Sequence, residues 1–160
     1  MKIYIAADHA GFHLKRKLIA YLKIKGYEIE DMGAYEMDEE DDYPDFVIPC
    51  ALRVAESHSQ GKHGEALGIV IGGSGNGEAI AANKVKGVRA DVFYGNPSTS
   101  SGSSIARLAK EHNDANVLSL GARFLSDDDA KKGVTLWLEA KFEGGRHKRR
   151  IEKISQFEKG

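Results

Sequence analysis

The chain has 160 residues, of which 41% are hydrophobic and 29% charged, and its formal net charge is −1 at pH 7. This length suits one domain with a substantial core, expected over residues 1–160, and the near-neutral charge gives no overall field that would attract nucleic acid or a membrane surface. No apolar run reaches about 18 residues, the apolar N-terminal segment is too short for a signal peptide, and a single cysteine excludes an internal disulfide and a CxxC metal motif, so we expect a cytoplasmic protein without a membrane span.

The first half of the chain alternates strand-like and helix-like segments. Residues 2–7 are short, apolar and β-prone, and residues 12–25 place apolar side chains at helical spacing. Residues 27–32 indicate a second strand. Residues 36–45 hold seven acidic residues in ten and are read as a solvated loop, while Pro44 is well placed to begin a helix that continues to about residue 57.

The second half continues this alternation. Residues 67–71, LGIVI, form a continuous apolar run typical of a central strand in a parallel sheet, and a glycine-rich turn separates this strand from a helix at 78–84. Further strands are expected at 88–94 and 116–122, and further helices at 105–112, 127–140 and 151–159. The pattern predicts a three-layer α/β/α sandwich with a five-stranded parallel, Rossmann-like sheet and a C-terminal helix. In such sheets the ligand lies beyond the carboxyl ends of the strands.

The glycine-rich turn that follows residues 67–71 reads GGSGNG. It is not a P-loop, because no GK[ST] follows, and Glu78 stands where a dinucleotide fingerprint counted from Gly73 needs glycine. The backbone N–H groups of such a turn can converge on a negative charge at a helix N-terminus, whereas the structural alternative is a tight turn that needs positive φ. Four glycines with Ser74 and Asn76 favour an anion or oxyanion site.

Glu78 has two interpretations. A glutamate in the first turn of a helix stabilises the helix dipole by about 0.3–1 kcal/mol, and that alone could account for it. Alternatively, the helix N-terminus keeps Glu78 ionised, so that it acts as a general base while the N–H groups of the turn hold a forming enediolate oxygen.

Other polar residues follow strands or end helices. Asp8 and His9 come directly after the first strand, where a ligand is expected, although a capping Asp and a surface His are common. His112 and Asn113 end a helix and could simply cap it. Cys50 reads as a buried apolar residue rather than a nucleophile. The remaining histidines that are expected to be exposed are His13, His58 and His63.

The densest basic segment is RHKRR, residues 146–150. Arg146 and Arg150 are four residues apart, so on a helix they share one face, and two guanidinium groups on one face match a phosphate monoester. A solvated helix start is the structural alternative. Nucleic-acid binding is disfavoured by the near-neutral net charge and by the lack of interleaved aromatic residues.

Five segments in order carry a resemblance over nearly the whole chain. They are ADHAGF (7–12), DDYPDF (41–46), GGSGNGEAIAANK (72–84), KEHNDANVLSLGAR (110–123) and EGGRHKRRIEKI (143–154). Together they resemble the ribose-5-phosphate isomerase B family, which also includes galactose-6-phosphate and allose-6-phosphate isomerases. The resemblance implies aldose–ketose isomerisation of a phosphosugar through a cis-enediolate, without a metal or another cofactor. It also implies a homodimer or homotetramer with active sites at the subunit interface.

The resemblance also assigns roles to residues. Many family members carry a cysteine base just after the third strand, where this chain has Gly72, but a second subgroup places a glutamate at the start of the next helix, the position of Glu78. Glu78 is therefore expected to move the proton between C1 and C2, and His112 to open the furanose ring. The positions that match substrate-binding residues are Asp8, His9, Tyr43, Gly73, Ser74, Gly75, Asn76, Gly77, Asn113, Arg123, Arg146 and Arg150. The two C-terminal arginines are expected to take the phosphate, with His9 nearby.

We expect interconversion of ribose 5-phosphate and ribulose 5-phosphate, and two alternatives stay open. An isomerase of a six-carbon 6-phosphate needs a longer pocket, and the loop at 95–104, which is longer than expected for the family, is the place for that difference. A non-catalytic phosphate- or nucleotide-binding module with a flavodoxin-like layout needs no base at residue 78.

Overall fold

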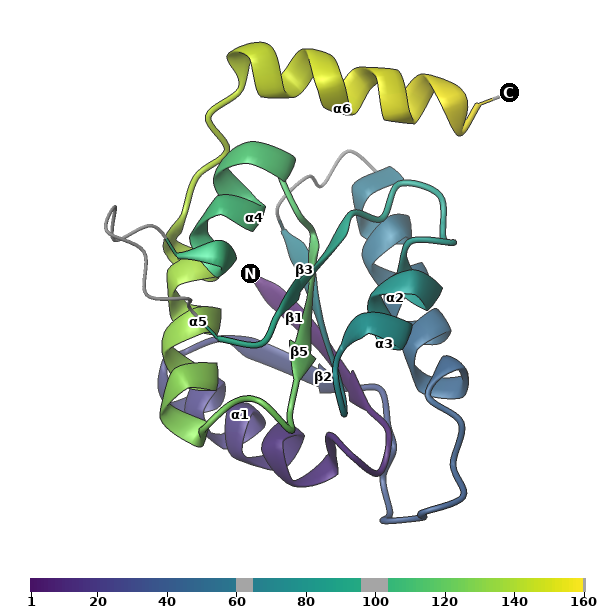
Figure 1. Ribbon diagram of the computed structural model, residues 1–160, viewed down its shortest axis with the longest axis vertical. Helices are drawn as coiled ribbons and strands as arrows, with labels where there is room; N and C mark the ends of the chain where they lie inside the picture. The colour runs from purple at the N-terminus through teal and green to yellow at the C-terminus, as the bar shows by residue number, and fades with distance from the viewer. Residues whose placement is uncertain (60–64, 96–103, 160) are drawn as a thin grey trace.

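The computed structural model describes residues 1–59, 65–95 and 104–159. Within these residues, parallel strands form a five-stranded sheet in the order β2-β1-β3-β5-β4 (Figure 1). The strands are β1 (Lys2–Ala7), β2 (Glu28–Asp31), β3 (Ala66–Gly72), β4 (Ala90–Phe93) and β5 (Val117–Gly121). The helices are α1 (Phe12–Ile24), α2 (Pro44–Ser59), α3 (Asn76–Ala82), α4 (Ile105–Asn113), α5 (Asp127–Glu139) and α6 (Gly145–Phe157).

Two layers of helices cover the sheet. On one face, α1, α4 and α5 pack against strand side chains that include Ile3 and Ile5. On the other face, α2 and α3 pack against side chains that include Tyr4 and Ala6. Successive side chains of a strand point to opposite faces, so each central strand contributes to both cores. This architecture confirms the three-layer α/β/α sandwich that the alternating pattern predicts.

The C-terminal helix α6 stands outside these two layers. Figure 1 shows it lying across the end of the molecule at which β5 begins. His147 is its one buried residue, whereas Ile154 and Phe157 are 55% and 88% exposed. A helix of this length that buries so little apolar surface is marginal in water on its own, so α6 is suited to a further packing partner.

Most predicted elements lie within two residues of their observed bounds, and α6 is the main exception. It begins at Gly145, six residues before the predicted 151, so Arg146 and Arg150 lie within its first turns rather than ahead of it. The basic residues of this segment have good helix propensity, and two glycines precede them, Gly144 and Gly145, both with positive φ. The predicted loop at 95–104 lies largely outside the described residues, since 96–103 are not among them.

The structure also tests two predictions about single side chains, namely the burial of Cys50 and the exposure of three histidines. Cys50 is fully buried, as expected, and burial raises the pKa of its thiol to about 12, which makes it inert. The expectation that His58 is exposed is wrong: it is buried at the end of α2, with its ring nitrogen Nε2 3.2 Å from the carbonyl oxygen of Ala66. His13 is exposed, and His63 lies outside the described residues.

No helix among the described residues combines the length and the apolar content needed to cross a bilayer.

Candidate active site

The predicted site residues fall into two groups at opposite ends of the sheet. The first, called here the carboxyl-end group, lies where β1, β3 and β5 end and consists of Asp8, His9, Tyr43, the turn Gly73–Gly77, Glu78 and Arg123. The second, called the amino-end group, lies near the start of β5 and consists of His112, Asn113, Arg146 and Arg150.

Glu78 is the buried carboxylate of the carboxyl-end group. It lies in the first turn of α3 and is only 4% exposed. Its carboxylate fills the space beside Gly72, the last residue of β3, because a Cβ built on Gly72 would overlap both carboxylate oxygens. Gly72 therefore leaves room for the Glu78 side chain, at the position where the resembling family carries a cysteine in many members.

The electrostatics of Glu78 differ from the sequence-based expectation. The helix N-terminus was expected to govern its ionisation, but burial is the largest effect and raises its pKa above the ordinary value of 4.5. The negative charge of Asp8 acts in the same direction, while a hydrogen bond from the backbone N–H of Glu78 opposes it. Desolvation outweighs this backbone donor because a buried carboxylate loses its water shell. A carboxylate with a raised pKa is the stronger proton acceptor once it is ionised.

The glycine-rich turn is held in place by β5. Gly75 has φ of +78°, a left-handed conformation that favours glycine, and it precedes the first residue of α3. The buried hydroxyl of Ser119 donates to the carbonyl oxygen of Gly75 at 2.6 Å, and the N–H of Asn76 donates to Ser74 Oγ at 3.3 Å. The sequence carries no signal for the role of Ser119. This serine alternates with apolar residues on a central strand, so only the tertiary contact reveals its role.

Arg123 and Tyr43 approach the two ends of this turn. The N–H of Arg123 donates to the carbonyl oxygen of Gly73 at 3.0 Å, and a Cβ built on Gly73 would lie 3.0 Å from Cζ of the arginine. A Cβ built on Gly77 would lie 3.0 Å from the ring of Tyr43. Glycine at these two positions thus allows the guanidinium and the phenol to approach the turn closely.

His9 is paired with a residue that sequence analysis did not single out. Its Nδ1 lies 2.6 Å from Oδ1 of Asp41, and its backbone N–H donates to the same oxygen at 3.1 Å. The hydrogen bond that His9 makes to the Asp41 carboxylate is the largest effect on His9 and raises the pKa of the imidazole above 6.5. The acidic segment 36–45 is predicted to be a solvated loop, and Glu36 through Glu40 are indeed exposed, but the Asp41 side chain is only 7% exposed. The one feature of the sequence that could have indicated a role for Asp41 in the site is its position two residues before Tyr43.

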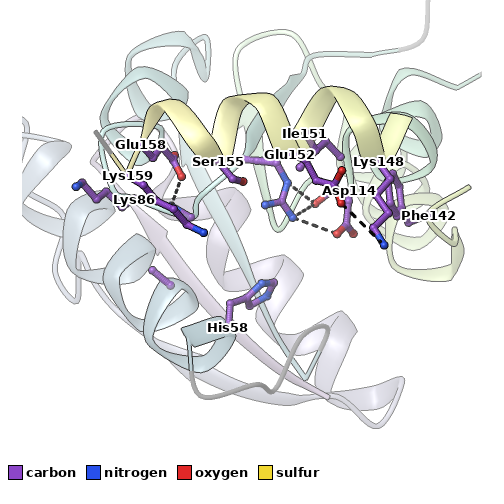
Figure 2. A pocket seen from close by; sticks show the side chains of 13 residues that line it. His58, Lys86, Asp114, Phe142, Lys148, Ile151, Glu152, Ser155, Glu158 and Lys159 are labelled. Atoms are coloured by element: carbon purple, nitrogen blue, oxygen red, sulfur yellow. Dashed lines mark hydrogen bonds and ion pairs between the residues drawn. The ribbon is translucent and has the colours of Figure 1, made fainter. Parts of the chain in front are cut away.

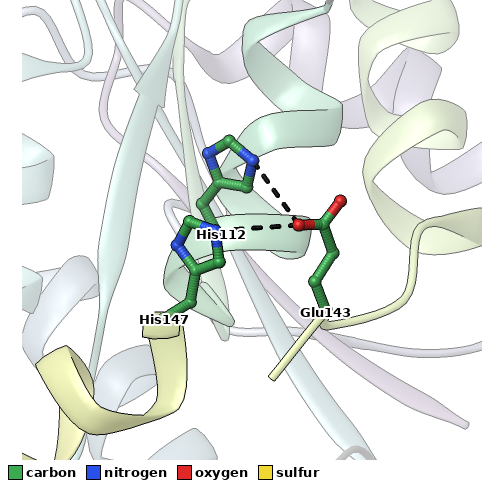
Figure 3. A group of neighbouring side chains, drawn as sticks. All are labelled: His112, Glu143 and His147. Carbon is green, nitrogen blue, oxygen red and sulfur yellow. Dashed lines mark ion pairs between the residues drawn. The ribbon is translucent and has the colours of Figure 1, made fainter. Parts of the chain in front are cut away.

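The amino-end group is built from the end of α4 and the start of α6. His112 and His147 stack with ring centroids 4.2 Å apart, and Glu143 Oε2 lies 3.9 Å from Nε2 of His112 and 3.6 Å from Nε2 of His147 (Figure 3). Burial is the main reason that the pKa of His147 falls below its ordinary value, and the neighbouring His112 and Arg146 add to the effect. His147 and Glu143 were not predicted as site residues, although both lie in the matching segment 143–154.

The remaining members of this group are exposed. Arg146 and Arg150 are one turn apart on α6, as predicted, and both face solvent. Asn113 ends α4, and its amide donates to Asp91 Oδ2 at 2.7 Å. Nε of Arg146 donates to Nε2 of His147 at 3.4 Å, and two exposed guanidinium groups beside a helix N-terminus are well suited to bind a dianion.

The two groups do not meet within one chain. His112 precedes the start of β5 and Arg123 follows its end. The five residues of β5 span roughly 16 Å at the usual rise of a strand. This separation exceeds the reach of a small phosphosugar, so residues of both groups can act on one substrate only if they come from different copies of the chain.

Two clusters have a composition that could hold a metal ion, namely Asp8–His9–Asp41 and His112–Glu143–His147. Ligands of one tetrahedral zinc ion lie about 3.4 Å apart. The 2.6 Å contact between His9 and Asp41 is instead a short hydrogen bond. In the other cluster the ring planes of the two histidines are within 10° of parallel, so their lone pairs do not converge, and Arg146 lies alongside. The geometry of both clusters suits proton transfer and anion binding.

A further groove lies elsewhere. It has a volume of about 760 Å³ and runs beneath α6, lined by His58, Lys86, Phe142, Ile151 and other residues (Figure 2). None of the predicted site residues lines it. Its depth results from α6 standing away from the two helix layers, so we place the candidate site at the two groups above.

Comparisons with known proteins find isomerases of one family. The family described as Ribose/Galactose Isomerase matches residues 3–154. A probable ribose-5-phosphate isomerase B of Mycoplasma genitalium is 43% identical over 157 residues, which cover 98% of this chain and 95% of that protein. Ribose-5-phosphate isomerase B of Mycobacterium leprae is 42% identical over 165 residues, which cover 99% of this chain and 91% of that protein.

Solved structures give the same result. A crystal structure of ribose-5-phosphate isomerase B from Mycoplasma genitalium with bound ribulose-5-phosphate has a TM-score of 0.89 and 42% identity, covering 99% of this chain and 96% of that one. The ribose-5-phosphate isomerase B of Clostridium thermocellum has a TM-score of 0.83 and 46% identity, covering 99% and 98%. The similarity in sequence and in fold therefore extends over nearly the whole of this chain and of each of the two solved chains.

Proposed function

The chain belongs to the ribose/galactose isomerase family, and we propose that it interconverts ribose 5-phosphate and ribulose 5-phosphate through a cis-enediolate. The observation that carries this proposal is the buried Glu78 carboxylate, which lies against Gly72 and beside a turn of backbone N–H groups. The relatives named as ribose-5-phosphate isomerases, one of them with bound ribulose-5-phosphate, support the choice of sugar.

Glu78 acts as the base in this proposal. After the ring opens, its carboxylate takes the proton from C2 of the aldose, and the electron pair moves through the new C1–C2 double bond to the carbonyl oxygen O1. The carboxylic acid then returns the proton to C1, while a proton leaves O2 and another reaches O1, which gives the ketose. A base that serves both carbons must lie over one face of the enediolate, and a fixed buried side chain suits that task.

The glycine-rich turn stabilises the intermediate. N–H groups of Gly73–Gly77 are aimed at an oxygen that becomes negative only when Glu78 takes its proton, and each well-placed donor of this kind is worth about 3 kcal/mol. Asp8, Tyr43 and Arg123 surround the same turn and bind the sugar. Glu78 does not repel this substrate, because the phosphate is held by Arg146 and Arg150, with His9 nearby, and not by the turn.

His112 opens the furanose ring, with Asn113 beside it, and Arg146 and Arg150 bind the phosphate. A ring-opening group must exchange protons near neutral pH, which suits a histidine. Glu143 and His147 lie next to the His112 ring and supply a route for its proton.

We further propose that the active unit is at least a homodimer in which each site combines the carboxyl-end group of one copy with the amino-end group of the other. The support is the separation of the two groups along β5 and the exposure of apolar side chains that a second copy would cover. These include Ile80 on α3, Leu52 on α2, and Ile154 and Phe157 on α6. A site shared in this way is incomplete in a single chain.

The match over residues 3–154 supports one sugar-phosphate isomerase domain over 1–160. A cytoplasmic location is proposed because the one thiol, Cys50, is buried and unpaired and the relatives are metabolic isomerases. No nucleic-acid or membrane partner is proposed.

A substrate panel tests the proposed function. We expect kcat/KM for ribose 5-phosphate to exceed that for allose 6-phosphate and galactose 6-phosphate, measured by coupled assay or by exchange of the C1 or C2 proton with solvent. A preference for a six-carbon sugar would replace the proposed substrate and direct attention to residues 95–104. Absence of turnover with every sugar, together with phosphate binding, would favour the non-catalytic module.

A further inference from the structure

Asp41 approaches His9 more closely than surface charges usually approach each other. One carboxylate oxygen, Oδ1, accepts from the backbone N–H of His9 at 3.1 Å and lies 2.6 Å from Nδ1 of the same residue. Both contacts join residues 32 positions apart in the chain. Two bonds to one oxygen fix the imidazole plane relative to the end of β1.

The Asp41 carboxylate is also unusually buried for a member of an acidic loop. Its side chain is 7% exposed, and the second oxygen, Oδ2, is buried with no hydrogen-bond partner among the described residues. Burying a carboxylate this far costs free energy unless a cation is close by. A protonated His9 is such a cation, and the short distance between Oδ1 and Nδ1 is typical of a charge-assisted hydrogen bond.

The charges that face His9 come from three segments. Asp41 from the acidic loop and Asp8 from the end of β1 both favour the imidazolium, while Arg123 after β5 opposes it. The hydrogen bond to Asp41, aided by the charges of the two carboxylates, outweighs the opposing effects of burial and of the guanidinium, so the pKa of His9 is raised. With Nδ1 bonded to Asp41, Nε2–H is the remaining ring donor, and the His9 side chain is 32% exposed, so the ring is accessible to a ligand in the carboxyl-end group.

We propose that Asp41 is a positioning residue that holds His9 as a fixed imidazolium, so that Nε2–H binds the phosphate of the substrate across the neutral pH range. This inference rests on the proposed function for the identity of the substrate. Among the described residues, the hydrogen bonds of the Asp41 side chain all go to His9. Without Asp41, a histidine with an ordinary pKa near 6.5 loses its charge as the pH passes neutrality, and its ring is free to turn.

The pH dependence of KM separates this role from a merely structural one. In Asp41→Asn, the amide oxygen still accepts from the backbone N–H of His9, but the negative charge is gone. We expect KM for ribose 5-phosphate to rise about 10-fold at pH 8, where the unassisted imidazole is neutral, and to change by less than about 2-fold at pH 6, where it is still protonated. The control is Glu40→Gln, which removes one charge from the exposed part of the same loop and should change KM at neither pH.

Two further measurements test the link to His9 itself. In the wild-type protein, NMR titration of the His9 ring should give a pKa clearly above 6.5, and Asp41→Asn should lower it by about one unit or more. In a His9→Asn background, adding Asp41→Asn should leave KM unchanged, because residues that act through one another are not additive. A wild-type pKa at or below 6.5, a KM effect of equal size at pH 6 and pH 8, or full additivity would each overturn the proposal.

The proposal can also fail or succeed independently of the isomerase function. Inorganic phosphate serves as a probe that needs no turnover. Titration with it at pH 8 should perturb the His9 ring resonances of the wild-type protein, and Asp41→Asn should weaken its affinity about 10-fold relative to Glu40→Gln. If the wild-type protein isomerised no sugar but showed these differences in phosphate affinity, the positioning role of Asp41 would be supported and the proposed reaction would be wrong. Equal phosphate affinity in all three proteins would contradict the role of Asp41 whatever the reaction.

Discussion

The Glu78 carboxylate occupies the space that any side chain at Gly72 would need. The first residue lies in the first turn of α3 and the second at the end of β3, so the absence of a Cβ at one position makes room for a buried acid from the other. Two arrangements of the same site follow from this geometry, one with a cysteine on the strand and one with a glutamate on the helix. They exclude each other sterically.

This exclusion predicts the outcome of exchanging the two bases. Gly72→Cys alone should displace Glu78 and lower kcat at least about 10-fold, because a shift of about 1 Å in a reacting group is costly. Gly72→Cys combined with Glu78→Ala relieves the overlap, so it should unfold at a higher temperature than Gly72→Cys alone. Thermal unfolding and steady-state kinetics of both variants provide the measurement. Wild-type kcat in Gly72→Cys would show that the two side chains fit side by side.

The raised pKa of Glu78 predicts a cost in stability. The folded protein binds this proton more tightly than the unfolded chain, so stability falls as the pH rises from about 4.5 through the folded-state pKa, and the cost is fully present above that value. Glu78→Gln removes the charge and should raise the unfolding temperature at pH 8, with the gain disappearing below about pH 4.5. Glu139→Gln, on the exposed end of α5, should show no such gain. A Glu78→Gln protein less stable than wild type at pH 8 would contradict the assignment of burial as the dominant effect.

The carboxyl-end group was largely predictable from sequence because parallel strands bring their ends to one edge. Asp8, the glycine-rich turn and Arg123 each follow a strand, and chain order alone places them together. The pKa of Glu78 was not predictable, because the sequence shows its place on a helix but not its burial. Asp41 was missed for a related reason: an acidic run reads as solvated, and only the contact with His9 distinguishes one carboxylate from its neighbours.

The division of the site between the two ends of the sheet was harder to predict from the sequence. The basic segment 146–150 carries the expected pair of arginines, but the start of α6 depends on packing against the end of α4 rather than on local propensity alone. The N–H of Glu143 donates to the carbonyl oxygen of Glu111 at 3.0 Å, which brings this segment to His112. Such contacts depend on the tertiary fold, which no periodicity in the sequence encodes.

Ser119 is predicted to support catalysis without touching the substrate. Ser119→Ala removes the hydroxyl that donates to the Gly75 carbonyl oxygen and leaves that oxygen with only the N–H of Ala79 as a donor, an effect of about 0.5–1.5 kcal/mol. Since the turn is proposed to stabilise the enediolate rather than the ground state, kcat should fall about 10-fold with KM changed by less than about 2-fold. Ser57→Ala, near the far end of α2, is the matched control. A change in KM alone would assign the turn to substrate binding instead.

Mixing inactive variants tests the shared site. If each site combines Glu78 of one copy with His112 of the other, dimers formed from Glu78→Gln and His112→Asn chains contain one intact site. Refolding the two together at equal amounts should then restore roughly a quarter of wild-type activity, because half of the dimers are mixed and each of these has one working site of two. Mixing His112→Asn with Arg146→Ala should restore none, since both changes lie in the same group. Equal recovery in both mixtures, or in neither, would contradict the proposed division.

The most direct test of the account is the turnover number of Glu78→Gln with ribose 5-phosphate, measured beside that of the wild-type protein at pH 7.5. The substitution keeps the size of the side chain and its ability to accept the backbone hydrogen bond, and it removes only the basic carboxylate. The account predicts a fall in kcat of at least about 10²-fold with little change in KM, the usual scale for loss of a general base. A turnover number within about 2-fold of the wild-type value would contradict the claim that Glu78 moves the proton.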